Sequence, residues 1–216
     1  IYGEYYQMET TVQIHEKPRI LVEIKSQTQE SHNSLERNAY GAGLMSGAMT
    51  REEYKSYLAA FYGFHAPLEE LAVKFNEWSQ YGIQIEKRLR APLLERDLMY
   101  LGMNASEIDA LPLCQQLPTT EDFPQICGAM YVMEGSTLGG QIQLRQTQKL
   151  FGFTAEAGAS YFFGYGAETG AMWKEFCRTL VAVASDIHAE SQMTAAKETF
   201  IALEEWFNLS LARQSR

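Results

Sequence analysis

A histidine and a glutamate one helical turn apart are the residues of this sequence best suited to chemistry. His32 and Glu36 lie in the segment KSQTQESHNSLE, which spans residues 25–36. A neutral imidazole is a common metal ligand, and a carboxylate that accepts a hydrogen bond from its second nitrogen strengthens it. His32 also borders the apolar stripe through Thr28 and Leu35, so its ring can point towards a buried ligand. The alternative, that His32 is an ordinary surface or core histidine and not a ligand, remains open.

Three cations are placed to accompany such a ligand. Lys25 precedes His32 by seven residues, on nearly the same helical face and ~10 Å away along the axis. Lys174 and Arg178 form a second pair, four residues apart on one face. Each could bind a carboxylate at the rim of a ligand whose metal lies at His32. The alternative is that all three are ordinary solvated side chains.

A glycine cluster in a helical context is the most informative stretch. Residues 130–141 read MYVMEGSTLGGQ and contain Gly135, Gly139 and Gly140. Each glycine inside a helix costs about 1 kcal/mol relative to alanine, so such a cluster indicates a kink, a close helix contact or a large ligand. Gly135 and Gly139 share one face, against which a flat ligand could lie. A loop or a tight helix crossing remains open, and no phosphate-loop pattern follows.

Composition limits the classes of function. The chain has 216 residues, of which 46% are hydrophobic and 21% charged, as expected for one globular domain. Its net charge of −9 argues against nucleic acid as a partner. No apolar run approaches the ~18 residues of a membrane span, and no secretory signal is visible. Three cysteines without C-x-x-C spacing indicate reduced thiols, so we expect a cytoplasmic protein. Because no apolar run is long enough to span a membrane, we expect no membrane partner.

The hydrophobic periodicity predicts an all-α fold. Alternating strand patterns are almost absent, and Thr50 with Glu53 forms a capping-box signature. We interpret residues 1–17 as an N-terminal tail and residues 18–213 as one helical domain. The sequence begins with Ile1 rather than Met, so the first residues of this tail need not be native. The predicted helical stretches are 19–39, 50–75, 84–100, 121–150, and 168–213, the last dividing into two helices near 190–193, with a glycine- and aromatic-rich connection at 152–167.

Together these segments resemble the heme oxygenase family, in bacterial form. Residues 25–36 resemble its proximal helix, 62–69 the helix that follows, and 134–141 its distal helix, in which glycines flex over the heme. Residues 173–178 fall where the family places cations for the propionates, and 196–200 continue the match. The resemblance covers about residues 18–207 in the right order. It implies a heme oxygenase-like bundle of helices with heme between a proximal helix and a kinked, glycine-rich distal helix.

The resemblance assigns roles residue by residue. His32 would be the proximal iron ligand and Glu36 its hydrogen-bonding partner, while Gly135, Ser136, Gly139 and Gly140 would form the catalytic distal segment. Lys25, Lys174 and Arg178 would bind the propionates.

The family uses O2 and external electrons to convert heme, which is both cofactor and substrate, into biliverdin, CO and ferrous iron. An electron donor such as a ferredoxin or flavodoxin reductase system would be a partner, and a photoreceptor that accepts the bilin is a further candidate.

One position departs from the family pattern. Well-studied animal-type members carry Asp directly after the first distal glycine, where it organises water for proton delivery; this chain has Ser136. A hydroxyl donates and accepts hydrogen bonds but brings no negative charge. We expect water held by the backbone, Ser136 and other polar groups to suffice.

Two other functions remain open on sequence. A non-catalytic heme-binding or trafficking protein on the same fold would also use His32. A di-iron enzyme would need several inward carboxylates and a Glu-x-x-His pair, which the sequence lacks, and a thiaminase-like enzyme would need a pocket cysteine, for which Cys127 and Cys177 are candidates. Of the other histidines, His15, His65 and His188 are not expected to bind metal, although His65 is a candidate for lining a pocket.

Overall fold

Helices make up the framework of this chain. The computed structural model describes residues 18–214, so the predicted tail at 1–17 lies outside the described residues. Within that part the elements are α1 (Arg19–Glu36), α2 (Ala39–Ser46), α3 (Arg51–Ala72), η1 (Asn76–Tyr81), η2 (Ile85–Arg88), α4 (Ala91–Tyr100), α5 (Ala105–Asp109), α6 (Phe123–Phe151), α7 (Ser160–Phe163), η3 (Gly166–Glu168), α8 (Thr169–Val183) and α9 (Asp186–Gln214). The described residues form no strand, only isolated bridges in the 154–158 turn. The predicted all-α class is therefore confirmed.

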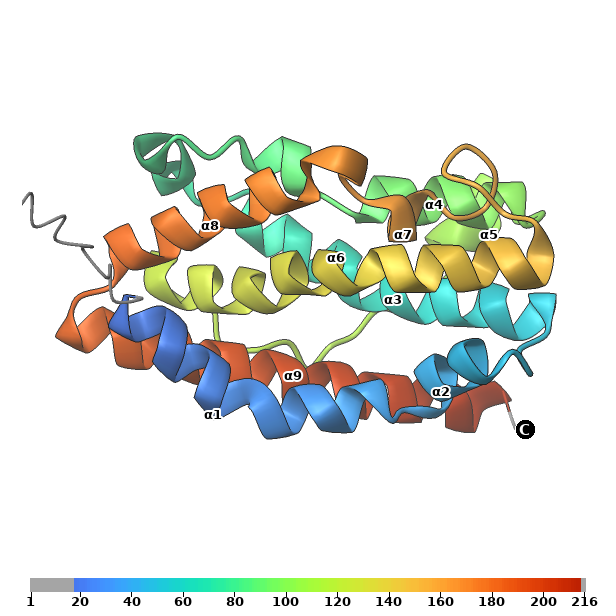
Figure 1. Cartoon of the computed structure of the whole chain (residues 1–216), viewed down its shortest axis with the longest axis horizontal. Coiled ribbons are helices and arrows are strands. Elements are labelled where there is room, and N and C mark those ends of the chain that lie inside the picture. The colour runs from blue at the N-terminus through green and yellow to red at the C-terminus, as the bar shows by residue number, and fades with distance from the viewer. Residues whose placement is uncertain (1–17, 215–216) are drawn as a thin grey trace, which may run out of the picture.

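The long helix α6 runs through the middle of the bundle (Figure 1). It packs along α9, which in turn packs along α1, while α8 covers another side of α6. The helices α3 and α4 pack on each other, and α7 bridges α4 and α6. This arrangement leaves one face of α6 opposite α1, with α3 and α9 closing the space between them. No helix among residues 18–214 is long and apolar enough to cross a membrane.

Local sequence signals fix where the central helices begin. Thr50 accepts a hydrogen bond from the backbone N–H of Glu53, whose carboxylate accepts from the Thr50 backbone, so the predicted capping box is present at α3. Asp122 and Gln125 form the same reciprocal pair at the start of α6. The predicted helix over 121–150 thus appears as one uninterrupted helix that contains all three glycines.

A proline inside α3 ties that helix to a neighbouring connection. Pro67 has no N–H, so the carbonyl of Gly63 loses its partner within the helix. The backbone N–H of Cys114 donates to that carbonyl at 2.7 Å. A Cβ at Gly63 would lie 2.5 Å from the carbonyl oxygen of Pro112, so the close approach requires glycine. The connection between α5 and α6 is therefore fastened to α3.

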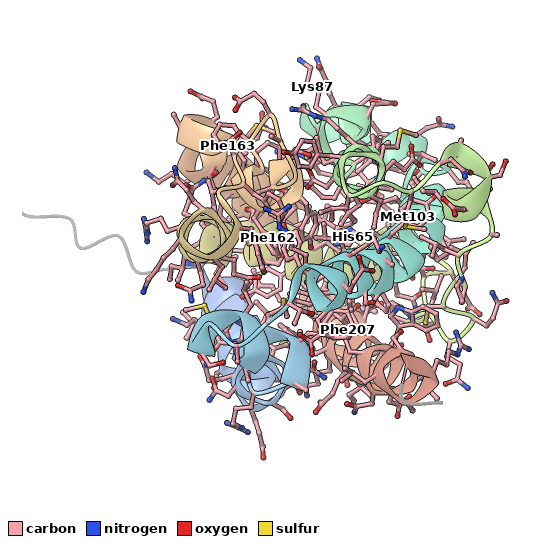
Figure 2. All side chains as sticks on the ribbon, turned by 90° about the vertical axis from the view of Figure 1, so that its right-hand side faces the viewer. His65, Lys87, Met103, Phe162, Phe163 and Phe207 are labelled. Carbon is pink, nitrogen blue, oxygen red and sulfur yellow. The ribbon has the colours of Figure 1, made fainter. Side chains whose placement is uncertain are left out.

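Aromatic side chains form the core beside the central face of α6. Phe61 of α3 packs edge-to-face against Phe207 of α9, with ring centroids 5.0 Å apart, and lies 4.8 Å from Tyr161 of α7. In the end-on view, Phe162 lies to the left of His65 and Phe207 lies below it (Figure 2). The aromatic core thus links α3, α7 and α9 around one buried histidine.

Three predicted boundaries are wrong. The stretch 19–39 divides at residues 37–38, because Asn38 caps α2 by accepting from the Tyr40 backbone at 3.0 Å. The helix predicted over 84–100 begins only at Ala91, after a 3-10 turn, with a proline in its first turn. The last two helices separate at residues 184–185 rather than at 190–193, since Ala184 is extended and α9 continues unbroken past Gln192.

Candidate functional site

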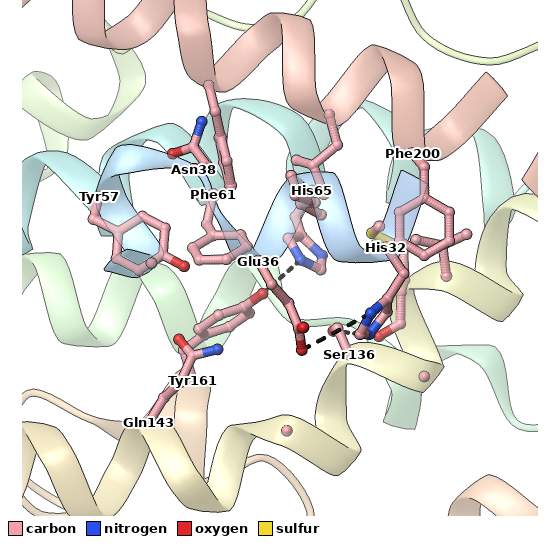
Figure 3. Close-up of a pocket in the computed structure, with 18 of the residues that line it drawn as sticks. His32, Glu36, Asn38, Tyr57, Phe61, His65, Ser136, Gln143, Tyr161 and Phe200 are labelled. Carbon is pink, nitrogen blue, oxygen red and sulfur yellow. Dashed lines mark hydrogen bonds and ion pairs between the residues drawn. The ribbon is translucent and has the colours of Figure 1, made fainter. Parts of the chain in front are cut away.

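A largely apolar cavity of about 430 Å³ separates α1 from α6 (Figure 3). Side chains from α3 and α9 close it, and Met45 of α2 lies at its edge. The polar side chains among its walls include two histidines, His32 and His65. The lining residues are His32, Leu35, Glu36, Asn38, Gly41, Met45, Tyr57, Phe61, His65, Val132, Met133, Gly135, Ser136, Gly139, Ile142, Gln143, Tyr161, Phe200, Leu203 and Phe207.

A second cavity of about 420 Å³ continues the first along the same two helices. Four residues line both cavities: His32, Val132, Gly135 and Phe200. Lys25 lines the second cavity on the α1 side, and Trp173 of α8 lines it on the far side. The two spaces form one cleft between α1 and α6, with a cation at one end and an apolar chamber at the other.

His32 is placed at the meeting point of the two cavities. Its side chain is 50% exposed, and its ring packs edge-to-face on Phe200 with centroids 5.9 Å apart. The predicted partner Glu36 lies one turn on, where its Oε1 is 3.8 Å from Nδ1 of His32. That distance suits an ion pair rather than a hydrogen bond. The ring is therefore steered by Phe200 and by the charge of Glu36, while one side remains open to the cleft.

The glycines of α6 divide into two kinds. A Cβ at Gly139 would meet no described atom within 4 Å, and one at Gly135 would meet only Trp173, at 3.6 Å. A Cβ at Gly140 would lie 2.6 Å from the carbonyl oxygen of Phe162, and Gly140 does not line the cleft. Packing thus explains Gly140, which lies against α7, whereas Gly135 and Gly139 face the cleft. Of the four predicted distal residues, the structure brings Gly135, Ser136 and Gly139 to the cleft.

The three predicted cations lie in different places. Lys25 lines the cleft, whereas Lys174 and Arg178 are exposed on α8 and line neither of its cavities. Ser136 lines the apolar cavity, and its hydroxyl donates to the carbonyl of Met133 at 2.7 Å. The structure therefore brings Lys25, His32 and Ser136 to one cleft and leaves the α8 pair outside it.

A buried hydrogen-bonded chain behind the cleft was not predicted from the sequence. Nδ1 of His65 is 2.9 Å from Glu69, and Nε2 is 3.0 Å from the hydroxyl of Tyr161. Glu69 also accepts from the backbone N–H groups of Arg90 and Ala91 at 2.7 and 3.0 Å. Burial raises the pKa of Tyr161 well above its usual value, so this phenol stays neutral.

The sequence signal for this chain was weak. His65 was a candidate for lining a pocket, which the structure confirms. Its neighbour Glu69 follows at i+4 and could have been noticed as a partner. Tyr161, by contrast, comes from a connection that no pattern links to α3.

A second buried network holds α6 against α8. Arg88 of η2 donates to Glu134 and, at 2.6 Å, to Glu175. The hydroxyl of Tyr165 donates to Glu134 at 2.6 Å. Burial raises the pKa of Glu134, and the guanidinium of Arg88 opposes part of that shift. This network fixes the helix turn directly before Gly135.

Among residues 18–214, the structure offers no site of the kind that a di-iron enzyme or a thiaminase-like enzyme would need. No group of three or more His, Cys, Asp or Glu side chains suited to a metal ion occurs among the described residues. Cys127 and Cys177 line neither cavity of the cleft. Burial raises the pKa of Cys177 to about 11 and that of Cys127 further, so both thiols are poor nucleophiles at neutral pH.

Comparison with known proteins identifies the fold. The structure resembles heme oxygenase from Leptospira interrogans, with a TM-score of 0.73 and 18% identity over 88% of this chain and 98% of that one. It also resembles the NO- and CO-bound enzyme from Neisseria meningitidis, with a TM-score of 0.69 and 22% identity over 88% and 92% of the two chains. Heme oxygenase-1 from the cyanobacterium Synechocystis, solved with heme, gives 0.70 and 16% over 91% and 96%.

The sequence itself carries the family assignment. No protein of curated function matches it at a significant level. The family model described as heme oxygenase, however, matches residues 19–209, which is nearly the whole of the part that forms helices. This match agrees with the bundle, the cleft between α1 and α6 and the glycines that face it. The chain belongs to the heme oxygenase family.

Proposed function

We propose that this chain binds heme in the cleft between α1 and α6 and opens the macrocycle oxidatively. The observation that carries the proposal is that His32 lines the same cavity as Gly139, a helical glycine that no described atom covers. A glycine inside a helix destabilises it by about 1 kcal/mol relative to alanine. No packing contact among the described residues requires a glycine at position 139. A flat ligand lying on the backbone of α6 would explain why a glycine stands there.

The walls of the cleft fit heme. The apolar cavity suits the macrocycle, and its size of about 430 Å³ falls within the range of roughly 300–1,000 Å³ that is usual for small-molecule sites. His32 would ligate the iron through the ring nitrogen that faces the cleft, with Glu36 as its partner. Lys25 would bind a propionate where the cleft continues. Lys174 and Arg178 remain predicted propionate contacts, since α8 borders the same end of the cleft through Trp173.

The residues on the distal side favour an oxygenase. When bound, heme supplies the iron that activates O2 and the carbon that is oxidised. Gly135 and Gly139 offer no side chain that could ligate iron from the distal side, so this side stays open for O2. Gly135 and Gly139 place no bulky acid–base group beside the macrocycle, and the α6 side chains that join them at this wall are Val132, Met133, Ser136, Ile142 and Gln143. The products are biliverdin, CO and ferrous iron.

The cellular setting is also part of the proposal. The reaction needs electrons, and a ferredoxin or flavodoxin reductase system would supply them. We further propose that the protein works in the cytoplasm, in keeping with its unpaired cysteines. A photoreceptor that takes up the bilin is a candidate partner.

The deciding experiment is an anaerobic heme titration followed by O2 and a reductant. We expect one heme per chain, loss of the Soret band after O2 is added, and release of bilin and CO. A protein that binds heme but keeps its Soret band under these conditions would be a heme carrier on the same fold. That outcome would exclude the oxygenase activity.

A further inference from the structure

One buried tyrosine of the apolar cavity has a hydroxyl without a hydrogen-bond partner among residues 18–214. Tyr57 of α3 lines this cavity and is only 4% exposed. Burial raises the pKa of Tyr57 above its usual value, and no hydrogen bond to another described residue contributes to that shift. At neutral pH the hydroxyl therefore keeps its proton and remains an unused donor.

Packing fixes the position of this hydroxyl. The Tyr57 ring stacks on Tyr40 of α2, with centroids 4.9 Å apart and an angle of 12° between the planes. Its centroid also lies 4.7 Å from that of Phe61 and 5.8 Å from that of Phe207 of α9. In Figure 3, Tyr57 and His32 lie on opposite sides of the cavity, and the Tyr57 hydroxyl points into the space between them. A ring held by three helices cannot turn to find another partner.

Asn38 lines the same cavity, but its side chain is engaged within the protein. Its Oδ1 accepts from the Tyr40 backbone at 3.0 Å, and its Nδ2 donates to Asn208 at 3.3 Å. Tyr57 has no such role. Buried polar groups in proteins are nearly always hydrogen-bonded, so its free hydroxyl indicates a ligand that carries an acceptor at this end of the cavity.

The orientation of heme narrows the choice of acceptor. Both propionates of heme lie on one edge, and their predicted contact Lys25 lines the second cavity, whereas Tyr57 lines only the apolar one. Along α1, Lys25 precedes His32 by about 10 Å, and Tyr40, on which Tyr57 stacks, comes after that helix has ended. A macrocycle with its propionates at Lys25 therefore turns its opposite edge towards Tyr57. That edge carries only methyl and vinyl groups, which accept no hydrogen bond.

We propose that Tyr57 recognises the product rather than the substrate, through a hydrogen bond from its hydroxyl to a carbonyl oxygen of the opened ring. This proposal rests on the proposed function. Ring opening removes one bridging carbon and leaves a carbonyl oxygen on each of the two pyrroles that it joined. Where that bridge is the one opposite the propionates, both oxygens lie at the end of the cavity that Tyr57 lines. Tyr57 thus holds the bilin in the cleft and slows its release.

The test measures the binding of two ligands to wild type and two matched variants. Iron-free biliverdin opened opposite its propionates is titrated without reductant and followed by its visible absorbance, and heme is titrated in parallel. Tyr57→Phe removes one oxygen and keeps the ring, so it should weaken biliverdin binding about tenfold, as loss of one hydrogen bond does, and leave heme binding unchanged. Tyr54→Phe is the control on the same helix. It loses a hydrogen bond to the carbonyl of Gly158 away from both cavities, so neither affinity should change.

Two further readouts report the contact itself. A hydrogen bond weakens a C=O bond, so the infrared carbonyl stretch of bound biliverdin should lie at lower frequency in wild type than in Tyr57→Phe. A biliverdin opened between its propionates carries its carbonyl oxygens at the Lys25 end instead. This isomer should bind wild type and Tyr57→Phe equally.

The outcomes separate this inference from the proposed function. Equal affinities of wild type and Tyr57→Phe for the first biliverdin would overturn the inference, as would an equal loss for heme and biliverdin, which would indicate a packing effect. A wild type that binds heme without opening it, but binds biliverdin through Tyr57, would remove the proposed function and retain Tyr57 as a bilin-binding residue. A wild type that makes bilin but binds it independently of Tyr57 would retain the function and overturn the inference.

Discussion

His32 of α1 and Gly135 of α6 line both cavities of the cleft, so an imidazole and a glycine without a side chain border the same space. The two residues are 103 positions apart, and only the packing of α1 and α6 around α9 brings them together. This relationship separates the contributions of the two helices: α1 provides an imidazole, and α6 provides a wall in which Gly135 and Gly139 add no side chain of their own.

Replacement of the ligand is the most direct prediction. His32→Ala should abolish the spectrum of histidine-ligated heme and weaken heme binding by more than the roughly 10–100-fold that loss of an outer-shell partner causes. Since the side chain is half exposed, the melting temperature should hardly change. Added imidazole should restore the spectrum. His188→Ala on α9 serves as the control, and an unchanged heme spectrum in His32→Ala would remove His32 from the site.

The two kinds of glycine in α6 should respond oppositely to alanine. Gly139→Ala should stabilise the heme-free protein by up to about 1 kcal/mol, because helix propensity improves and no described atom is in the way. It should also weaken heme binding. Gly128, a further glycine of α6, packs against α9. Gly128→Ala should destabilise the protein instead, because its Cβ would lie 2.1 Å from the carbonyl oxygen of Gln192.

Thermal unfolding without heme, followed by heme titration, tests both glycine variants. Tighter heme binding by Gly139→Ala would contradict a ligand that lies on the backbone of α6.

The contribution of each cation to heme binding should depend on its position relative to the cleft. Lys25→Ala should weaken heme binding by about tenfold, the value of one charge-assisted hydrogen bond, because Lys25 lines the cleft. The double variant Lys174→Ala with Arg178→Ala should loosen heme and mix the bilin isomers if α8 contributes to propionate binding. Chromatography of the bilins and heme titration give both answers. An unchanged affinity and isomer ratio in the double variant would exclude the α8 pair.

The capping box of α3 should give stability that depends on pH. Hydrogen bonds from Thr50 lower the pKa of Glu53 from its ordinary value of 4.5. A depressed pKa in the folded state means that the ionised form is favoured, so the contribution is complete above pH 4.5 and is lost as pH falls through the lowered pKa. Glu53→Gln should therefore lower the melting temperature at pH 7 but hardly at pH 3.

Thr50→Ala is the companion variant, with an expected loss of about 1 kcal/mol. An equal effect of Glu53→Gln at both pH values would show that the charge of Glu53 is not involved.

The sequence predicted the helices that carry regular signals and missed the rest. The capping box at Thr50 and the apolar periodicity located α3 and α6, because both signals are local. The division at Asn38 was missed, since an asparagine cap looks like any polar residue in a helix until the chain turns. The boundary at residues 184–185 carries neither glycine nor proline, and so offered no signal.

The prediction of the site residues was limited in the same way, because only local signals could be found in the sequence. His32, Gly135 and Gly139 could be found because each breaks the pattern of its own helix. Gly140 was grouped with them by adjacency, although only its contact with Phe162 explains it. Arg90 and Tyr161 lie at the ends of irregular connections, where no periodicity states which way a side chain points. Their meeting behind Ser136 is a property of tertiary packing alone.

Pro67 gives the loop after α5 an unusual place in the dynamics of the protein. Because Cys114 supplies the amide that Pro67 lacks, the loop cannot detach without exposing the carbonyl of Gly63 inside the helix that holds His65. In hydrogen exchange, the Cys114 amide should therefore be protected as strongly as the core amides of α3 and exchange only on global opening. A segment drawn as a surface connection would then belong to the most stable unit of the bundle.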